Sequence, residues 1–136
     1  MALHPRDPIA RLIKLMDVCN RCERIFDATG KFASNVRMRQ LAADIQSSVT
    51  RIGFELQKEL RRIEPEGSRQ LFSSVMQSIE PDELENSSRT CLEKTLDEYR
   101  NAIESRVPPH ARAMIRRQYC ELNQFYEELT QSPEAA

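Results

Sequence analysis

Residues 34–63 read SNVRMRQLAADIQSSVTRIGFELQKELRRI, and this stretch decides the fold. Its apolar residues recur every three or four positions, which is the spacing of one helix face. That face consists of Met38, Leu41, Ile45, Ser48 or Val49, Ile52, Leu56, Leu60 and Ile63. Ser34 or Asn35 can cap the first turn, and the helix ends at Ile63, before Glu64-Pro65. At about 1.5 Å per residue it is about 40 Å long, a length typical of helical bundles.

Gly53 lies in the middle of this predicted helix. Glycine there costs about 1 kcal/mol relative to alanine. A close helix contact would explain it, but we favour a tolerated surface position.

A similar amphipathic stretch precedes residue 34. Asp7-Pro8 is typical of a helix start, because Asp caps free N–H groups and proline is tolerated at the first helical position. Gly30 is the expected end. The inward face reads Ile9, Leu12, Met16, Cys19, Glu23 and Phe26. Glu23 is the one charged residue on that face.

Two further helices are predicted in the second half of the chain, one from Pro81 to Pro108-Pro109 and one from there to about Gln131. The third inward face reads Leu84, Ser88, Cys91 or Leu92, Thr95, Tyr99, and Ala102 or Ile103. The fourth reads Ala111, Met114 or Ile115, Gln118, Leu122, Phe125 and Leu129.

The links between these helices predict the topology. Short links at 30–35 and 106–109 favour two antiparallel hairpins, and the longer middle link allows a crossover between them. That link carries a short helix with an apolar face of Leu71, Phe72, Val75, Met76 and Ile79. The sequence therefore predicts an all-α, ferritin-like antiparallel four-helix bundle with a crossover connection carrying a short extra helix. We expect residues 1–136 to form one domain, with flexible ends at 1–6 and 131–136.

The composition bounds the class of protein. Hydrophobic residues at 40% and charged residues at 30% indicate a soluble globular chain. With 20 Lys and Arg against 21 Asp and Glu, no basic surplus favours nucleic acid or membrane binding. The N-terminus has proline and charge where a signal peptide has its apolar run. We therefore expect a cytoplasmic protein whose cysteines are thiols.

The second half of the chain resembles a known family. The run CLEKTLDEYR at 91–100, Val107-Pro108-Pro109 and RQYCEL at 117–122 resemble a bacterial family of ferritin-like four-helix-bundle proteins of unknown function. Leu12 to Ala28 is similar to its first helix. The resemblance implies the same crossover bundle, a homodimer and at most an association with bacterial stress responses.

A ferritin-like bundle suggests a di-iron site, which takes Glu from two helices and Glu-x-x-His from the other two. The histidines here are His4 and His110, and neither follows a Glu by three residues, so that site cannot be built. The remaining candidate ligands for Fe or Mn are Glu23, Glu55 or Glu59, Glu93 and Glu121. We favour the alternative that Glu23 pairs with an arginine of a neighbouring helix while the others are solvated.

The sequence Cys19-Asn20-Arg21-Cys22 places two thiols one helical turn apart. They are candidates for a redox pair or, with Cys91 and Cys120, for a zinc site. The flanking pattern is neither that of a zinc loop nor that of a thioredoxin-like motif. We therefore favour thiols packed in or near the core.

Sequence motifs for nucleophilic catalysis and phosphoryl transfer are missing. Basic residues cluster at Arg61-Arg62 and at Arg112, Arg116 and Arg117, which favours either an anionic or acidic partner or an ordinary solvated face. Aromatic residues of the last helix form either an exposed surface or part of the core or dimer interface; these are Tyr119, Phe125 and Tyr126.

Two function classes remain. We expect a non-catalytic bundle that acts by self-association or by binding a protein partner, without a cofactor. The alternative is a metal-binding protein or oxidoreductase with Fe or Mn on carboxylates, or Zn on thiols.

Overall fold

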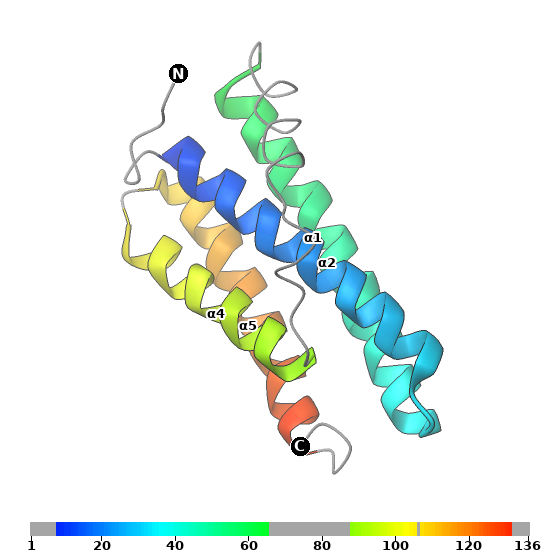
Figure 1. Cartoon of the computed structure of the whole chain (residues 1–136). Coiled ribbons are helices and arrows are strands. Elements are labelled where there is room, and N and C mark those ends of the chain that lie inside the picture. The colour runs from blue at the N-terminus through cyan, green and yellow to red at the C-terminus, as the bar shows by residue number, and fades with distance from the viewer. Residues whose placement is uncertain (1–7, 66–87, 106, 132–136) are drawn as a thin grey trace.

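The computed structural model describes residues 8–65, 88–105 and 107–131; the short helix predicted at 71–79 lies outside them. Its helices are α1 (Pro8–Phe32), α2 (Val36–Ile63), α4 (Ser88–Glu104) and α5 (Pro109–Thr130). They lie side by side, so the predicted all-α bundle is confirmed (Figure 1). No helix in the described ranges is long and apolar enough to cross a membrane.

The helix ends follow the sequence signals closely. The Asn35 side chain accepts hydrogen bonds from the backbone N–H groups of Arg37 and Met38, at 2.7 and 3.2 Å, so Asn35 rather than Ser34 caps α2. The helix ends at Ile63 as predicted. In contrast, α1 continues past Gly30 to Phe32, because Gly30 does not adopt the positive φ that would end the helix.

Residue pairs between the helices fix their directions. Gln46 donates to Asp27 at 3.3 Å between α1 and α2, and the hydroxyls of Thr29 and Ser88 lie 2.6 Å apart where α1 ends and α4 begins. Arg100 Nε donates to the Tyr119 hydroxyl at 3.2 Å between α4 and α5. In Figure 1, α2 and α4 run in one direction, and α1 and α5 run in the other.

The core follows the predicted inward faces, with one extension. Most predicted inward positions of α2 are buried, whereas Leu41 and Ile63 are half-buried. On α1 the predicted Ile9 and Glu23 are half-buried, and further residues are buried beyond the predicted ones; these are Leu15, Asp17, Val18 and Cys22. The buried face of α1 is wider than one stripe because this helix packs against both α2 and α4.

Packing between the helices is uneven. The contacts of α1 with α2 are extensive, and α4 packs along both α1 and α5, whereas α2 and α5 touch sparsely. A Cβ atom added at Gly53 would meet nothing within 4 Å, so this glycine lies in open space, as the favoured interpretation held. The sparse seam between α2 and α5 is the part of the fold that positions the candidate site.

Candidate functional site

A groove of about 560 Å³ lies between α2 and α5. Its α2 wall carries Glu55, Lys58, Glu59 and Arg62, and its α5 wall carries His110, Ala113, Met114 and Arg117. The volume is in the range of small-molecule and peptide side-chain sites. The groove therefore brings together charged residues from two distant parts of the sequence.

Glu59 is a buried carboxylate at the base of this groove, with 5% of its surface exposed. Arg62 Nε donates to both of its oxygens, at 3.1 and 3.2 Å, and Arg62 Nη2 donates to Oε1 at 2.5 Å. His110 Nε2 lies 3.6 Å from Glu59 Oε2. These hydrogen bonds raise the pKa of Arg62. The Arg62 guanidinium therefore holds the Glu59 carboxylate through charge-assisted hydrogen bonds.

Glu55 begins a polar path through the interior of the bundle. It accepts from Arg117 at 2.9 Å, from Arg51 at 3.3 Å and from the Gln118 amide at 3.0 Å. The Gln118 carbonyl accepts from the Tyr99 hydroxyl at 2.8 Å. That hydroxyl lies 3.8 Å from Cys19 Sγ. The path therefore joins side chains of all four described helices.

The interior half of this path is fully buried. Tyr99 is 0% exposed, and burial raises the pKa of its phenol well above the ordinary value. Sequence reasoning placed Tyr99 and Gln118 on inward faces but did not connect them. The sequence feature that could have indicated this contact is Gln118 itself, because a buried amide needs hydrogen-bond partners for both its oxygen and its nitrogen.

The predicted carboxylate ligands are dispersed among arginine contacts. Glu59 is bound by Arg62, and Glu121 forms an ion pair with Arg51. Glu93 accepts from the Tyr126 hydroxyl at 2.5 Å and from Arg89 at 3.2 Å. Within residues 8–65, 88–105 and 107–131, no three His, Cys, Asp or Glu side chains are grouped to hold a metal ion. The structure does not bring the glutamates together.

Glu23 differs from the other glutamates. It is half-buried and lines a smaller cavity of about 190 Å³ between α1 and α2, beside Gly53 and Phe54. No ion pair joins it to another residue in the described part of the chain. The arginine partner expected for Glu23 is therefore not found among the described residues, whereas Glu93 and Glu121 keep solvent contact, with 43% and 33% of their side chains exposed.

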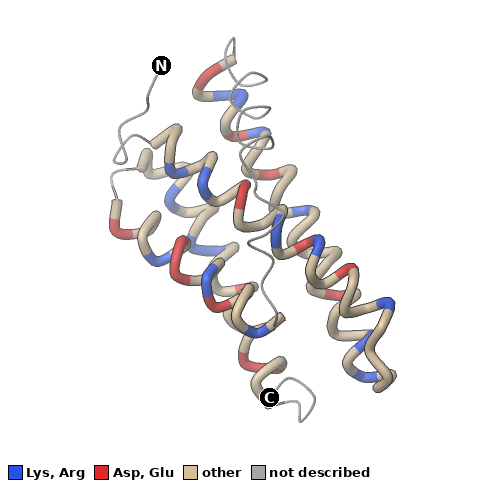
Figure 2. The backbone as a smooth tube through the Cα atoms, in the orientation of Figure 1, with Lys and Arg blue, Asp and Glu red and all other residues tan. Residues whose placement is uncertain are grey.

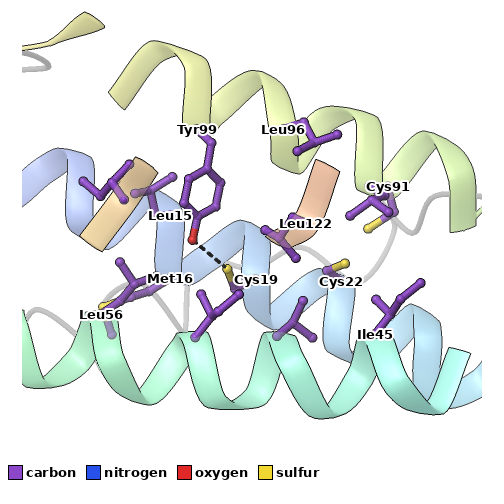
Figure 3. Close-up of a cluster of buried hydrophobic side chains, with 14 of the residues drawn as sticks. Leu15, Met16, Cys19, Cys22, Ile45, Leu56, Cys91, Leu96, Tyr99 and Leu122 are labelled. Atoms are coloured by element: carbon purple, nitrogen blue, oxygen red, sulfur yellow. Dashed lines mark hydrogen bonds between the residues drawn. The ribbon is translucent and has the colours of Figure 1, made fainter. Parts of the chain in front are cut away.

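Cys19, Cys22 and Cys91 are buried, and Cys120 is exposed. The Cys22 sulfur is turned toward the Cys91 sulfur, whereas the Cys19 sulfur lies against the Tyr99 hydroxyl (Figure 3). Burial raises the pKa of Cys19 to about 12. The prediction that the thiols pack in or near the core is confirmed for these three cysteines. Cys120 is exposed, so it does not share the buried environment of the other three candidate zinc ligands.

Both signs of charge are spread over the helices (Figure 2). The two predicted basic clusters nevertheless meet, because Arg62 and Arg117 line the same groove. The aromatic residues of α5 are packed against the core, as one of the two interpretations required; these are Tyr119, Phe125 and Tyr126. Tyr119 also lies under the Arg100 guanidinium, 5.8 Å from ring centroid to Cζ. The groove therefore brings charged side chains of α2 and α5 together.

Comparison of the chain with protein-family models, with curated proteins and with solved structures finds no match. The resemblance to a ferritin-like family consequently stays a prediction, and the functional argument rests on the geometry of the groove.

Proposed function

We propose that this chain is a non-catalytic helical-bundle protein that binds an acidic segment of a protein partner in the groove between α2 and α5. The observation that carries this proposal is the layered charge of the groove. Its carboxylates lie deep and are already paired with arginines, whereas its cations lie near the mouth.

The exposed fractions of the side chains support this layering. Those of Glu59 and Glu55 are 5% and 27% exposed. Those of Arg62 and Arg117 are 55% and 63% exposed, and that of His110 is 73% exposed. Lys58 is also exposed. A partner that approaches from solvent therefore meets cationic groups before it meets the neutralised carboxylates.

The groove also contains apolar side chains, which favour an apolar group on the partner. Ala113 and the half-buried Met114 lie on the α5 wall among the long stems of the charged residues. Methionine adapts its shape to different apolar side chains. We infer that the partner places a Leu or Ile side chain against Met114 and its carboxylates beside Lys58 and Arg117.

Binding to labelled peptide pools tests the proposal. One fluorescent pool combines Leu and Ile with Glu and Asp, and the matched pool replaces the acids with Lys and Arg. Fluorescence anisotropy should show saturable binding of the acidic pool alone, weakening as salt is raised because the charged contacts are exposed.

The variant Lys58→Glu should weaken this binding about tenfold or more, since a cation at the mouth becomes an anion. Arg39→Glu is the matched control, because it makes a similar charge reversal at an exposed position near the start of α2. Equal effects of the two substitutions, or equal binding of both pools, would contradict a specific acidic site.

We also propose ferritin-like connectivity and a homodimer. The connectivity is supported by the antiparallel pairs α1 with α4 and α2 with α5, and by the common direction of α2 and α4 in Figure 1. Light scattering measures the oligomeric state. If Lys58→Glu converts dimers to monomers and the Arg39→Glu control does not, a second copy of the chain occupies the groove. The acidic-partner proposal is then wrong.

A further inference from the structure

We propose that Cys22 and Cys91 are the site of an intramolecular disulfide that fastens α1 to the first turn of α4. The inference is independent of the groove, which lies on the other side of the bundle. It concerns thiols that the proposed binding function leaves unused.

The geometry selects one pair among the cysteines. Cys22 lies on α1, and Cys91 lies near the start of α4. Figure 3 shows the two sulfur atoms turned toward each other, and the contact with Cys91 together with burial raises the pKa of the Cys22 thiol well above its ordinary value. Cys19 is one helical turn away from Cys22, but its Sγ lies against the Tyr99 hydroxyl.

One side-chain contact joins α1 to the first turn of α4. The hydroxyls of Thr29, about two turns after Cys22, and of Ser88, about one turn before Cys91, lie 2.6 Å apart. Thr95 donates its hydroxyl hydrogen to the Cys91 carbonyl at 2.9 Å, one turn further along α4. The contact between Thr29 and Ser88 keeps α1 beside the start of α4, and a bridge additionally requires the Cα atoms of Cys22 and Cys91 to lie within about 7 Å of each other.

The chemistry requires a two-electron oxidant, for which hydrogen peroxide is the simplest. One thiolate attacks a peroxide oxygen, the O–O bond breaks, and water leaves while the sulfur becomes a sulfenic acid. The second thiol then attacks that sulfur and the hydroxyl leaves as a second water molecule. One peroxide is reduced, and the protein loses two hydrogen atoms. Because both thiols are buried, the reaction proceeds through transient opening and is slow.

Tryptic peptides identify the linkage directly. Cleavage after Arg21 separates Cys19 from Cys22, which falls in residues 22–24, and Cys91 falls in residues 90–94. We would expose the folded, reduced full-length Cys120→Ser variant to hydrogen peroxide, alkylate the remaining thiols in denaturant, digest and record mass spectra. This substitution removes the exposed thiol, which would otherwise join two chains. The expected product links residues 22–24 to residues 90–94.

Matched variants in this background sharpen the test. Cys19→Ala removes a buried thiol from the same helix, and the linked peptide should persist; Cys22→Ala should abolish it. A link between Cys19 and Cys22, a link between Cys19 and Cys91, or no link after oxidation would overturn the proposal. Should the Cys22→Ala protein fail to fold, the linkage found in the parent protein still decides.

Discussion

The interface between α1 and α4 and the interface between α2 and α5 differ in the side chains that they contain. Between α1 and α4, apolar side chains, thiols and the Tyr99 phenol form a buried core. Between α2 and α5, contacts are sparse and arginine–glutamate pairs surround an open groove. The comparison indicates that burial at the α1–α4 interface stabilises the bundle, whereas the α2–α5 interface leaves charged side chains accessible to a ligand.

The largest difference should come from trimming one buried apolar side chain of α4 and one half-buried side chain of the groove. Leu96 on α4 is buried, and Leu96→Ala should cost about 2–5 kcal/mol of unfolding free energy, because it leaves a cavity. Met114 is half-buried in the groove, and Met114→Ala should cost less than about 1 kcal/mol, because water already reaches this side chain. Urea unfolding measures both. Equal losses would mean that the two interfaces are equally packed.

A smaller effect should follow from breaking the polar path that joins the two sides. Gln118→Leu removes the acceptor of the Tyr99 hydroxyl and one donor to Glu55, which should cost about 1–3 kcal/mol. Adding Tyr99→Phe should recover part of that loss, since no orphaned hydroxyl then remains. A double-mutant cycle in urea measures the coupling. Additive losses would show that the two side chains act independently.

Glu23 offers a test on the α1–α2 face, where no ion pair with a described residue holds the carboxylate. Glu23→Leu should be neutral, or stabilising by up to about 1 kcal/mol, because a half-buried charge is replaced by apolar surface. Glu23→Gln is the isosteric control for the charge. A loss of several kcal/mol on thermal melting, together with metal in elemental analysis of the wild-type protein, would instead favour the carboxylate-metal alternative.

The smallest effect concerns Glu93 on the outer surface of α4. The hydrogen bond from Tyr126 and the charge of Arg89 hold the pKa of Glu93 below its ordinary value of 4.5. A lowered carboxyl pKa stabilises the fold above the unfolded pKa, and this contribution is lost as pH falls through the folded pKa. Tyr126→Phe should raise the pKa of Glu93 in an NMR titration. An unchanged pKa would show that the hydrogen bond contributes nothing.

Sequence periodicity predicted the helices well because burial of one face repeats regularly along the chain. Asn35, Ile63 and Pro109 marked helix ends that the structure confirms. The wider buried face of α1 was not predictable from one stripe, because Leu15 and Cys22 are buried by a neighbour that the spacing does not reveal.

The candidate site was only partly predictable, because partners far apart in sequence decide it. The basic clusters containing Arg62 and Arg117 were visible, but their meeting in one groove depends on how α2 lies against α5. Similarly, Cys19 and Cys22 suggested a pair by spacing alone. The structure places Cys91 against Cys22 and Tyr99 against Cys19, and neither contact has a local signature.

The most direct test of the central claim is to map an acidic peptide onto the protein by NMR, using the tightest-binding member of the Leu, Ile, Glu and Asp pool. The account predicts saturable shifts and intermolecular contacts at Lys58 on the α2 wall of the groove and at Met114 and Arg117 on its α5 wall. Contacts at the exposed Phe54 on the α1–α2 face, or no saturable shifts at the groove, would contradict it.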